Sequence, residues 1–482
     1  MRKTKIIATL GPATESETAL ATLIDANVNV FRLNMSHATH DWVRTIVRRI
    51  RSLSQKKGRH VGILMDTQGP AIRTGDLPTK LNLKTGDIFT FTVRGFKSEE
   101  EYSVDTNYDD LINDIQVGDH VLVDNGVIEM LVKEKRDQEL VCKVLTPGTM
   151  GSRRHINLPG VKVNLPALTE KDLADLEVGV EVGVDIVALS FVRQANDISL
   201  LRQVLAAKGR EDILLVAKIE DQSAVRNINE IIDASDAIMV ARGDLGIECP
   251  YEELPIIQRR IVKKCVTAGK PVIVATHMLE SMISNPSPTR AEITDVANAV
   301  FEEADAIMLS GETTVGKYPR KCVEVLDRVA RRIERSGTIE FHRSLHLVRE
   351  RDKVAASAVH MANHLPADGI CVFSHRGLMP AICAALRPRH CPIFAFTPHV
   401  RLANRLTLRY GIIPVQMELQ ADPARTILDA EKLLLERQML APGSRVVVVT
   451  LTAVGDKLVD TVQLRVLGAP AHQSPYSLDS DA

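Results

Sequence analysis

The chain has 482 residues, enough for about three domains of ordinary size. Hydrophobic residues make up 45% of it and charged residues 25%, which are ordinary globular values and exclude a disordered or fibrous chain. Lys plus Arg number 60 against 61 for Asp plus Glu, and aromatic residues amount to only 4%. This balance argues against a nucleic-acid-binding protein, which would carry a basic excess and aromatic residues for base stacking.

The seven cysteines are odd in number and include no Cys-x-x-Cys pair, which is typical of reduced thiols in a cytoplasmic protein. The apolar run near the start, Ile6–Ala8, is too short for a signal peptide. No stretch approaches about 18 consecutive uncharged apolar residues, so we expect no membrane-spanning helix. The sequence therefore predicts a cytoplasmic protein with no membrane partner.

Short runs rich in β-branched residues, each followed by a stretch with helical periodicity, recur in the first two thirds of the chain. Their apolar side chains follow one another without alternation, as in parallel strands covered on both faces. We expect strands at Lys5–Thr9, Val28–Leu33, Val61–Asp66, Asp185–Phe191, Ile213–Ile219, Ala237–Ala241, Pro271–Thr276 and Asp305–Leu309. Strands alternating with helices in this way predict a (β/α)8 TIM barrel, an α/β fold.

The segment 70–164 interrupts the regular spacing between the third and fourth strands. Val and Thr alternate with charged residues there, and turn signals occur at Gly86, Gly118 and Asn125. This pattern predicts a small antiparallel β domain inserted in a barrel loop. The catalytic barrel would then comprise residues 1–69 and 165–337.

Residues 338–482 form a third predicted unit, which alternates helices with strands and should be a doubly wound α/β domain. Its expected helices are 353–363 and 424–439, and its expected strands are 369–374, 392–397 and 445–450. The final residues, 471–482, are rich in Ser, Asp and Pro and are expected to fray.

Polar residues follow the predicted barrel strands at the point where each strand ends, and the loops at these ends carry the chemistry of a barrel. The polar segments are Arg32–His37, Asp66–Pro70, Ser190–Phe191, Lys218–Glu220, Arg242–Asp244, Thr276–Met282 and Ser310–Thr313. Because they share one end of one barrel, they predict a single active site.

Lys218 and Glu220 are the most informative pair, because residues two apart on a strand point to the same side. On its own the pair is equally consistent with an internal ion pair. Asp244, after the neighbouring strand, adds a second carboxylate, and two carboxylates suit a hard cation of the Mg²⁺ type completed by water and substrate oxygens. Gly243 beside it would let a ligand approach the backbone, although a lone glycine is more often a turn residue.

Arg32, Arg73 and Lys218 add positive charge around this expected metal site. Arg binds phosphate-like anions through paired hydrogen bonds, and Lys acts as a point charge. Cations beside a divalent metal indicate a phosphorylated or carboxylated substrate, with phosphoryl transfer as the leading chemistry. The alternative is that these basic residues are only solvated surface charges.

Four further residues offer oxygen ligands with a single formal charge, which suits a monovalent cation, although each is equally a candidate loop cap. They are Asn34, Ser36, Asp66 and Thr67. His37 and His277 have no Cys or second His at ligand spacing, so we expect no transition-metal site.

Several segments resemble motifs of pyruvate kinase, in the same order along the barrel. They are Thr4–Pro12, Arg32–His37, Asp66–Gly75, Ala217–Glu220, Ala241–Gly246, Ala275–Met282, Pro286–Glu292 and Met308–Thr313. The inserted β domain and the terminal α/β domain also fall where that family has them. The resemblance implies transfer of a phosphoryl group from phosphoenolpyruvate to ADP, giving pyruvate and ATP in glycolysis.

The resemblance also implies roles for individual residues. Glu220 and Asp244 would hold Mg²⁺ (or Mn²⁺), and Lys218 and Arg32 would meet the phosphoryl group. The other implied residues are Gly243, Asp244 and Thr276 at the substrate carboxylate; Thr276 and Ser310 in the proton relay; Asn34, His37, Arg73 and Arg154 on the nucleotide side; and Asn34, Ser36, Asp66 and Thr67 as K⁺ ligands. The inserted domain would act as a lid, and the implied assembly is a homotetramer.

The sequence departs from the family pattern at several positions. Gln68 and His277 stand where the family often has Lys and Gln, and neither change removes an essential charge. Ala71 stands where many members carry Glu with K⁺ dependence and others carry Lys with K⁺ independence, so the monovalent requirement stays open. Leu378 and Met379 replace polar residues of a loop that binds sugar-phosphate effectors, which predicts no response to a sugar bisphosphate.

Two alternatives to an active pyruvate kinase remain from the sequence. A metal-dependent aldolase or lyase of the related barrels would keep the metal carboxylates but need neither the lid nor Arg73. A catalytically silent homologue would be expected to lose Lys218, Glu220 or Asp244, and all three are present.

Overall fold

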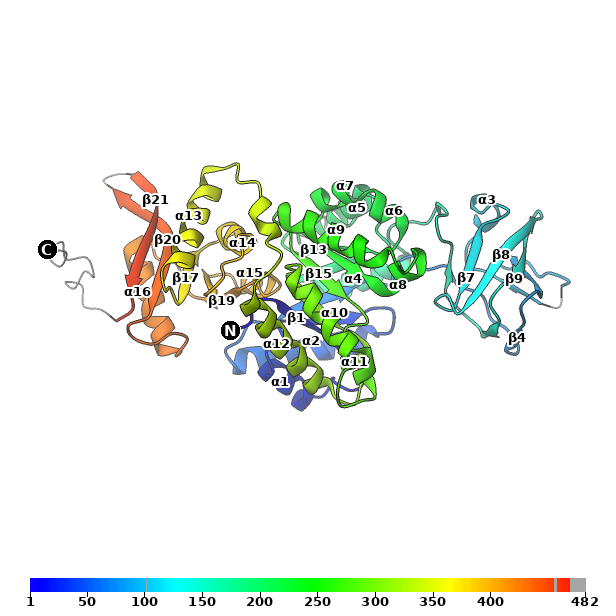
Figure 1. The fold of residues 1–482 in the computed structure, drawn as a ribbon, viewed down its shortest axis with the longest axis horizontal. Helices are drawn as coiled ribbons and strands as arrows, with labels where there is room; N and C mark the ends of the chain where they lie inside the picture. Colours follow the sequence, from blue (N-terminus) through cyan, green and yellow to red (C-terminus); the bar gives the residue numbers. More distant parts are fainter. Residues whose placement is uncertain (101, 455–456, 469–482) are drawn as a thin grey trace.

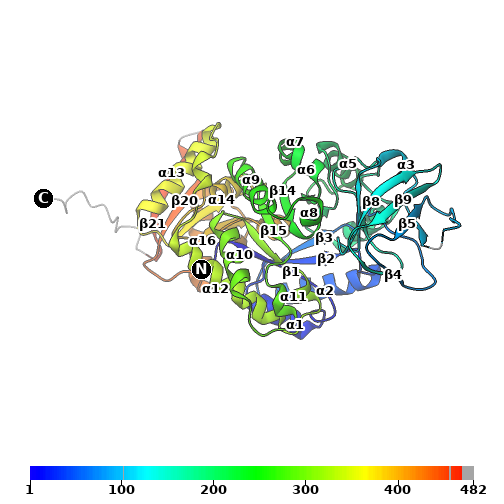
Figure 2. The same cartoon turned by 45° about the vertical axis from the view of Figure 1, so that its right-hand side comes forward.

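The computed structural model describes residues 1–100, 102–454 and 457–468. Figure 1 shows three units in a row, with a barrel at the centre, the inserted domain at one end and the C-terminal domain at the other, and the turned view of Figure 2 shows the same order. None of the described helices is long and apolar enough to cross a membrane. The expected fraying of residues 471–482 lies outside the described residues.

The central unit is the predicted TIM barrel, whose parallel strands close in the order β1-β16-β15-β14-β13-β12-β3-β2. The strands are β1 (Lys5–Thr9), β2 (Val30–Asn34), β3 (Gly62–Asp66), β12 (Ile186–Leu189), β13 (Leu214–Ile219), β14 (Ala237–Ala241), β15 (Val272–Ala275) and β16 (Ala306–Leu309). Apolar side chains such as Leu64, Val216 and Met239 fill the interior. The barrel is therefore a packed core, and ligands must bind at its ends.

Helices cover the outside of the barrel, and several begin at a Ser or Thr whose side chain caps the first turn. Thr169 and Thr289 form capping boxes with Asp172 and Glu292, which satisfy backbone N–H groups at the helix start. The helices are α1 (Glu17–Asp25), α2 (His40–Lys56), α4 (Glu170–Val182), α5 (Ala195–Ala206), α6 (Gln222–Arg226), α7 (Ile228–Ala234), α8 (Arg242–Glu248), α9 (Leu254–Thr267), η1 (Glu280–Ile283), α10 (Arg290–Phe301), α11 (Gly311–Thr314), α12 (Pro319–Ser336) and η2 (Phe341–Ser344).

The inserted segment folds as a small β unit with its own core, which includes Phe89, Phe91 and Met130. One sheet has the order β11-β7-β8-β9-β5-β6, and a second pairs β10 with β4. The elements are β4 (Leu81–Leu83), β5 (Ile88–Thr92), β6 (Ser103–Asp105), α3 (Leu111–Asp114), β7 (His120–Val123), β8 (Ile128–Lys135), β9 (Glu139–Val144), β10 (Gly148–Met150) and β11 (Ile156–Asn157). We call this unit the lid.

The C-terminal unit is an α/β domain whose sheet has the order β19-β18-β17-β20-β21. Its elements are α13 (Glu350–His364), β17 (Gly369–Phe373), α14 (Leu378–Ala385), β18 (Ile393–Thr397), α15 (Val400–Leu406), β19 (Ile412–Gln416), α16 (Pro423–Glu436), β20 (Arg445–Val454) and β21 (Lys457–Val466). The sequence did not predict β19 or β21, which are the edge strands. Pro414 interrupts the strand pattern of β19 and is tolerated because an edge strand leaves one side unpaired.

Buried charged residues fix the C-terminal domain to the amino end of the barrel. The Arg387 guanidinium donates to both oxygens of Asp305, just before β16, with distances of 2.7 Å. The side-chain nitrogen of Lys5, at the start of β1, donates to the Ile412 carbonyl at 2.6 Å. The C-terminal domain therefore lies at the amino ends of the strands, and the lid lies at their carboxyl ends.

Candidate active site

A cavity of about 310 Å³ lies at the carboxyl ends of the barrel strands, where lid and barrel residues meet. The lid contributes Asp124, Asn125, Arg153, Arg154 and His155 to its wall. The predicted site residues that line it are Arg32, Asn34, Ser36, Thr67, Arg73, Arg154, Lys218, Glu220 and Asp244. Most of the residues predicted from strand ends therefore do surround one cavity.

Lys218 is the best-connected side chain of this cavity. Its ammonium lies 2.8 Å from Glu220 Oε1 and 3.1 Å from Asp66 Oδ1, and donates to Ser190 Oγ at 2.7 Å. Burial alone would lower the pKa of Lys218, but Asp66 and Glu220 outweigh it and raise that pKa above its usual value. Lys218 is therefore a permanent cation, and the internal ion pair left open by the sequence does form, in the wall of the cavity.

Asp66, at the end of β3, connects the two barrel cations. One of its oxygens faces Lys218, and the other accepts a hydrogen bond from Arg32 Nε at 2.6 Å. Burial would raise the pKa of Asp66, but Arg32 and Lys218 together hold it below its usual value. The buried carboxylate thus holds both cations side by side at the base of the cavity.

Glu220 and Asp244 supply two carboxylates on neighbouring elements, at the end of β13 and in the first turn of α8. Burial raises the pKa of Glu220 and Asp244 raises it further, while Lys218 opposes the shift. The other oxygen of Glu220 accepts the Phe191 N–H at 2.6 Å. In the described part of the chain no three His, Cys, Asp or Glu side chains are grouped to hold a metal. The pair nevertheless fits Mg²⁺, which uses one or two carboxylates with waters and substrate oxygens.

Gly243 and Thr276 lie beside Asp244, outside the cavity lining. The Gly243 N–H donates to Thr276 Oγ1 at 2.8 Å, and that hydroxyl donates to the Ala275 carbonyl at 2.6 Å. Thr276 has a φ of 66°, which is unusual for a β-branched residue and indicates local strain. Strain of this kind often occurs where a ligand is positioned.

Ser310 is a further predicted residue outside the cavity lining. Its N–H donates to Glu312 at 2.7 Å, whereas its hydroxyl oxygen is buried and has no hydrogen-bond partner within the described residues. A buried hydroxyl without a partner is costly, so it is available to a bound water or substrate.

The predicted nucleotide-side residues lie mainly where the lid meets the barrel. Arg154 contacts Asp124 at 3.2 Å, and its Nε is buried with no partner among the described residues. Arg73, on the first linker to the lid, donates to the Arg153 carbonyl at 3.3 Å. His37 is exposed on the turn after β2 and does not line the cavity.

The predicted K⁺ ligands lie at the ends of β2 and β3 and on the loops that follow these strands. Asn34 Oδ1 accepts the Ser36 N–H at 3.2 Å, and Thr67 Oγ1 accepts the Ser190 N–H at 3.1 Å. The Asp66 backbone carbonyl accepts the Met35 N–H at 3.0 Å, which joins the two loops.

The sequence did not assign a site role to Ser190, Asp124 or His155. Ser190 was visible as a polar residue at a strand end, and its hydroxyl now joins Lys218 to the Thr67 carbonyl. Asp124 and His155 belong to the lid, and no local pattern indicates which lid residues meet the barrel. Only the packing of the two units could reveal them.

Comparison with known proteins identifies relatives over nearly the whole chain. Residues 1–323 match the family "Pyruvate kinase, barrel domain", and residues 352–464 match "Pyruvate kinase, alpha/beta domain". The chain is 42% identical over 454 residues to the chloroplastic pyruvate kinase isozyme G of Nicotiana tabacum, covering 93% of this chain and 80% of that protein. It is 42% identical over 421 residues to the pyruvate kinase of Geobacillus stearothermophilus, covering 85% and 71%. The crystal structure of a pyruvate kinase from Cryptosporidium parvum superimposes with a TM-score of 0.91 at 35% identity, covering 97% of this chain and 96% of that one.

Proposed function

The chain belongs to the pyruvate kinase family, and we propose that the cavity between lid and barrel is the site of its reaction. The enzyme transfers the phosphoryl group of phosphoenolpyruvate to ADP and gives pyruvate and ATP. The observation that carries the site assignment is the placement of Lys218 against Asp66, Glu220 and Ser190, in a wall that also presents Arg32.

Lys218 and Arg32 would bind the phosphoryl group during transfer. A loose phosphoryl transition state is stabilised mainly by positioning and by fixed positive charge. Asp66 keeps both cations in place. Little reorganisation of the site is therefore required when the phosphoryl group moves from the oxygen of phosphoenolpyruvate to the oxygen of ADP. Removing one such charge typically costs about a hundredfold or more in rate.

Members of this family use Mg²⁺ and K⁺. Glu220 and Asp244 would hold the Mg²⁺ (or Mn²⁺), which supplies charge neutralisation for the phosphoryl oxygens when bound. The raised pKa of Glu220 supports this assignment. Burial and the neighbouring Asp244 carboxylate destabilise the ionised form of Glu220, and a bound cation would stabilise it. Asn34, Ser36, Asp66 and Thr67 are the proposed K⁺ ligands.

The substrate carboxylate would meet the backbone N–H groups of Gly243 and Asp244 together with Thr276. Thr276 and Ser310 would then pass a proton, through water, to the enolate carbon as pyruvate forms. The buried hydroxyl of Ser310 supports this role, since it is free to bond to water.

Asn34, His37, Arg73 and Arg154 would face the nucleotide. The lid would exclude water, so that ATP is made and phosphoenolpyruvate is not hydrolysed. The resemblance implies a homotetramer, and we place the protein in the cytoplasm because the seven cysteines, all buried and free, agree with a reducing compartment.

One assay tests the proposed function. Purified protein is given phosphoenolpyruvate, Mg²⁺ and K⁺, and pyruvate and ATP are both measured with and without ADP. We expect pyruvate and ATP in equal amounts, and both to depend on ADP. Pyruvate formation in the absence of ADP, or pyruvate formation with no ATP produced, would contradict the proposed transfer and favour a lyase or phosphatase activity.

A further inference from the structure

The short segment Phe191–Arg193 follows β12 and Ser190 and contacts Glu220 and both linkers of the lid. The first linker begins at Gly69, and the second comprises residues 161–165. The Phe191 N–H donates to Glu220 Oε2 at 2.6 Å. Phe191 has a φ of 55°, which is unusual for an aromatic residue and persists only where the surroundings enforce it. The position of this N–H, and with it the Glu220 carboxylate, therefore depends on what holds the segment.

The first lid linker packs against the Phe191 ring. Gly69 has a φ of 70°, and a Cβ on it would lie 2.8 Å from Phe191 Cδ2, so only glycine allows this close approach. The ring of His155, a lid residue, lies 6.1 Å from the Phe191 ring, centroid to centroid. Phe191 thus lies between the first linker, at Gly69, and His155 near the end of the lid.

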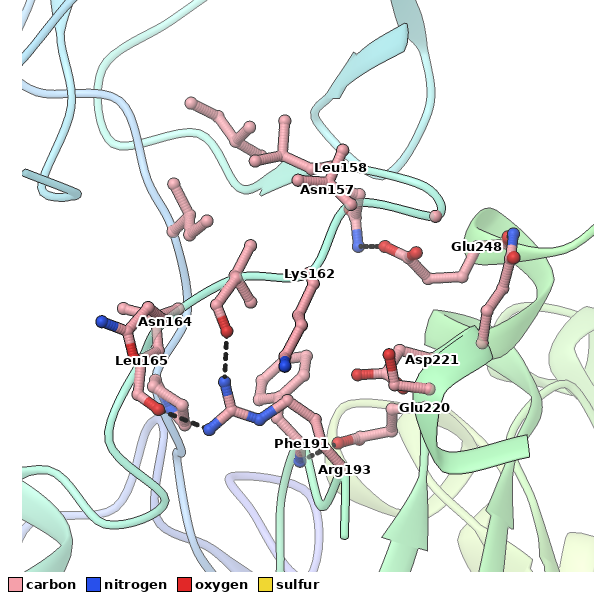
Figure 3. A pocket seen from close by; sticks show the side chains of 18 of the residues that line it. Asn157, Leu158, Lys162, Asn164, Leu165, Phe191, Arg193, Glu220, Asp221 and Glu248 are labelled. Atoms are coloured by element: carbon pink, nitrogen blue, oxygen red, sulfur yellow. Dashed lines mark hydrogen bonds between the residues drawn. The ribbon is translucent and has the colours of Figure 1, made fainter. Parts of the chain in front are cut away.

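The second lid linker is held by Arg193, as Figure 3 shows. The guanidinium donates to the Val163 carbonyl at 2.9 Å and also to the Leu165 carbonyl. The linker borders a cavity of about 560 Å³, and its apolar side chains, such as Val163, pack against the lid core and not the barrel core. Two charge-assisted hydrogen bonds therefore carry much of its attachment to the barrel.

The Arg193 backbone is also held by the barrel. Its N–H donates to Asp197 at 2.9 Å, and its carbonyl accepts from Asn227 at 2.8 Å. Because its backbone is bound to the barrel and its guanidinium to the linker, Arg193 joins the two, and the segment that carries Phe191 is held from both sides.

We propose that Arg193 is a positioning residue that couples the lid linker to the Glu220 carboxylate through the Phe191 N–H. It touches neither substrate nor metal in this role. The inference rests on the proposed function in one respect, namely that Glu220 binds Mg²⁺. Loss of Arg193 should free the linker and leave Glu220 less well oriented.

The test uses Arg193→Met and two measurements. Hydrogen exchange of the metal-free protein should be about 10- to 100-fold faster at the Val161 and Asn164 amides, which donate to the Leu158 carbonyl and Tyr108 Oη, because two charge-assisted bonds no longer hold the linker that carries them. The Mg²⁺ concentration for half-maximal activity should rise about 10- to 100-fold, as expected when a partner that orients a metal ligand is lost. The KM for ADP should also change less than the Mg²⁺ requirement.

Arg202→Met is the matched control, because Arg202 on α5 also donates to a backbone carbonyl, that of Ala234 at 3.0 Å, but does not contact the lid. Arg193→Lys keeps the charge without the fork and should recover only part of both effects; it also serves if Arg193→Met fails to fold. The proposal would be overturned if Arg193→Met had wild-type exchange rates or an unchanged Mg²⁺ requirement. It would also be overturned if Arg193→Lys recovered both properties fully, or if Arg202→Met showed equal effects. Failure of the proposed function is separate, since it would appear as an inactive wild-type protein.

Discussion

The Lys218 ammonium lies 2.8 Å from Glu220 Oε1, so the cation assigned to the phosphoryl group is neutralised by a carboxylate assigned to the metal. Asp66 shares the same cation at 3.1 Å. When Glu220 is engaged by a metal, Lys218 keeps one carboxylate partner and its remaining charge faces the cavity. The pair therefore relates metal binding to the positive charge available for phosphoryl transfer.

Lys218→Met should lower kcat by about a hundredfold or more, because the charge that meets the transferring group is removed. The fold should persist, since Asp66 keeps its bond to Arg32 and Glu220, with its raised pKa, can take up a proton. Steady-state kinetics and circular dichroism of the purified variant check both statements.

Lys5→Met is the control for this experiment. Lys5 is also a buried barrel lysine, but it lies at the amino end and donates to the Ile412 carbonyl. Its loss should leave kcat within a few-fold of wild type. Near-normal turnover of Lys218→Met would show that Lys218 has only a structural role.

Glu220→Gln and Asp244→Asn should each raise the Mg²⁺ concentration for half-maximal activity by about tenfold or more, because a neutral amide is a poorer ligand for a hard cation. Titration of activity against Mg²⁺ measures the effect. The matched control is Asp236→Asn, since Asp236 precedes β14 and lies at the opposite end of the same strand from Asp244. Mg²⁺ curves that coincide with wild type would mean that the two carboxylates are structural.

The sequence predicted the barrel well because its strands are buried on both faces and read as continuous apolar runs, as in β14 with Ala237–Ala241. It predicted that Lys218, Glu220 and Asp244 would lie together because strand ends converge in this fold, and all three line one cavity. It could not predict that Asp66 would be paired with both Arg32 and Lys218, since that contact joins separate strands. Lid residues such as Asp124 were also beyond local patterns, because their place depends on how two units pack.

Lys5 predicts a pH dependence of stability at the amino end of the barrel. Burial lowers the pKa of Lys5 from 10.5 to about 7. Between these values the unfolded chain binds the proton and the folded chain does not, so this group makes stability rise with pH. The contribution is on the order of 1.4 kcal/mol for each pH unit above 7.

The measurement compares wild type with Lys5→Met by thermal unfolding between pH 7 and 8.5. Both proteins have the same thiols, so the titration of the thiols cancels in the difference. Wild type should gain stability relative to Lys5→Met across this window, because the variant lacks the titrating group. Below pH 7 the difference should become constant, since Lys5 is then protonated in both states. Melting temperatures that run parallel above pH 7 would contradict the lowered pKa.

We expect that fructose 1,6-bisphosphate does not activate this enzyme, because of the loop Ser374–Met379 in the C-terminal domain. Ser374 Oγ already accepts the Gly377 N–H at 2.7 Å, so part of the loop's hydrogen-bonding capacity is used internally. Leu378 and Met379, at the start of α14, line the adjoining cavity of about 780 Å³ beside Arg349, Arg351 and Arg376. The two apolar side chains offer no donors to a phosphate where the family has polar residues.

Each missing charge-assisted hydrogen bond is worth roughly 1.5–3 kcal/mol, so the loss of two weakens a phosphate ligand by about a hundredfold or more. Saturation with phosphoenolpyruvate should therefore be the same with and without millimolar fructose 1,6-bisphosphate. The double variant Leu378→Ser, Met379→Thr restores two hydroxyl donors and should gain a response if the missing donors are the cause. A clear shift of the wild-type curve to lower phosphoenolpyruvate would show that the apolar loop does not prevent binding, because Arg376 in the same cavity would then suffice to hold the phosphate.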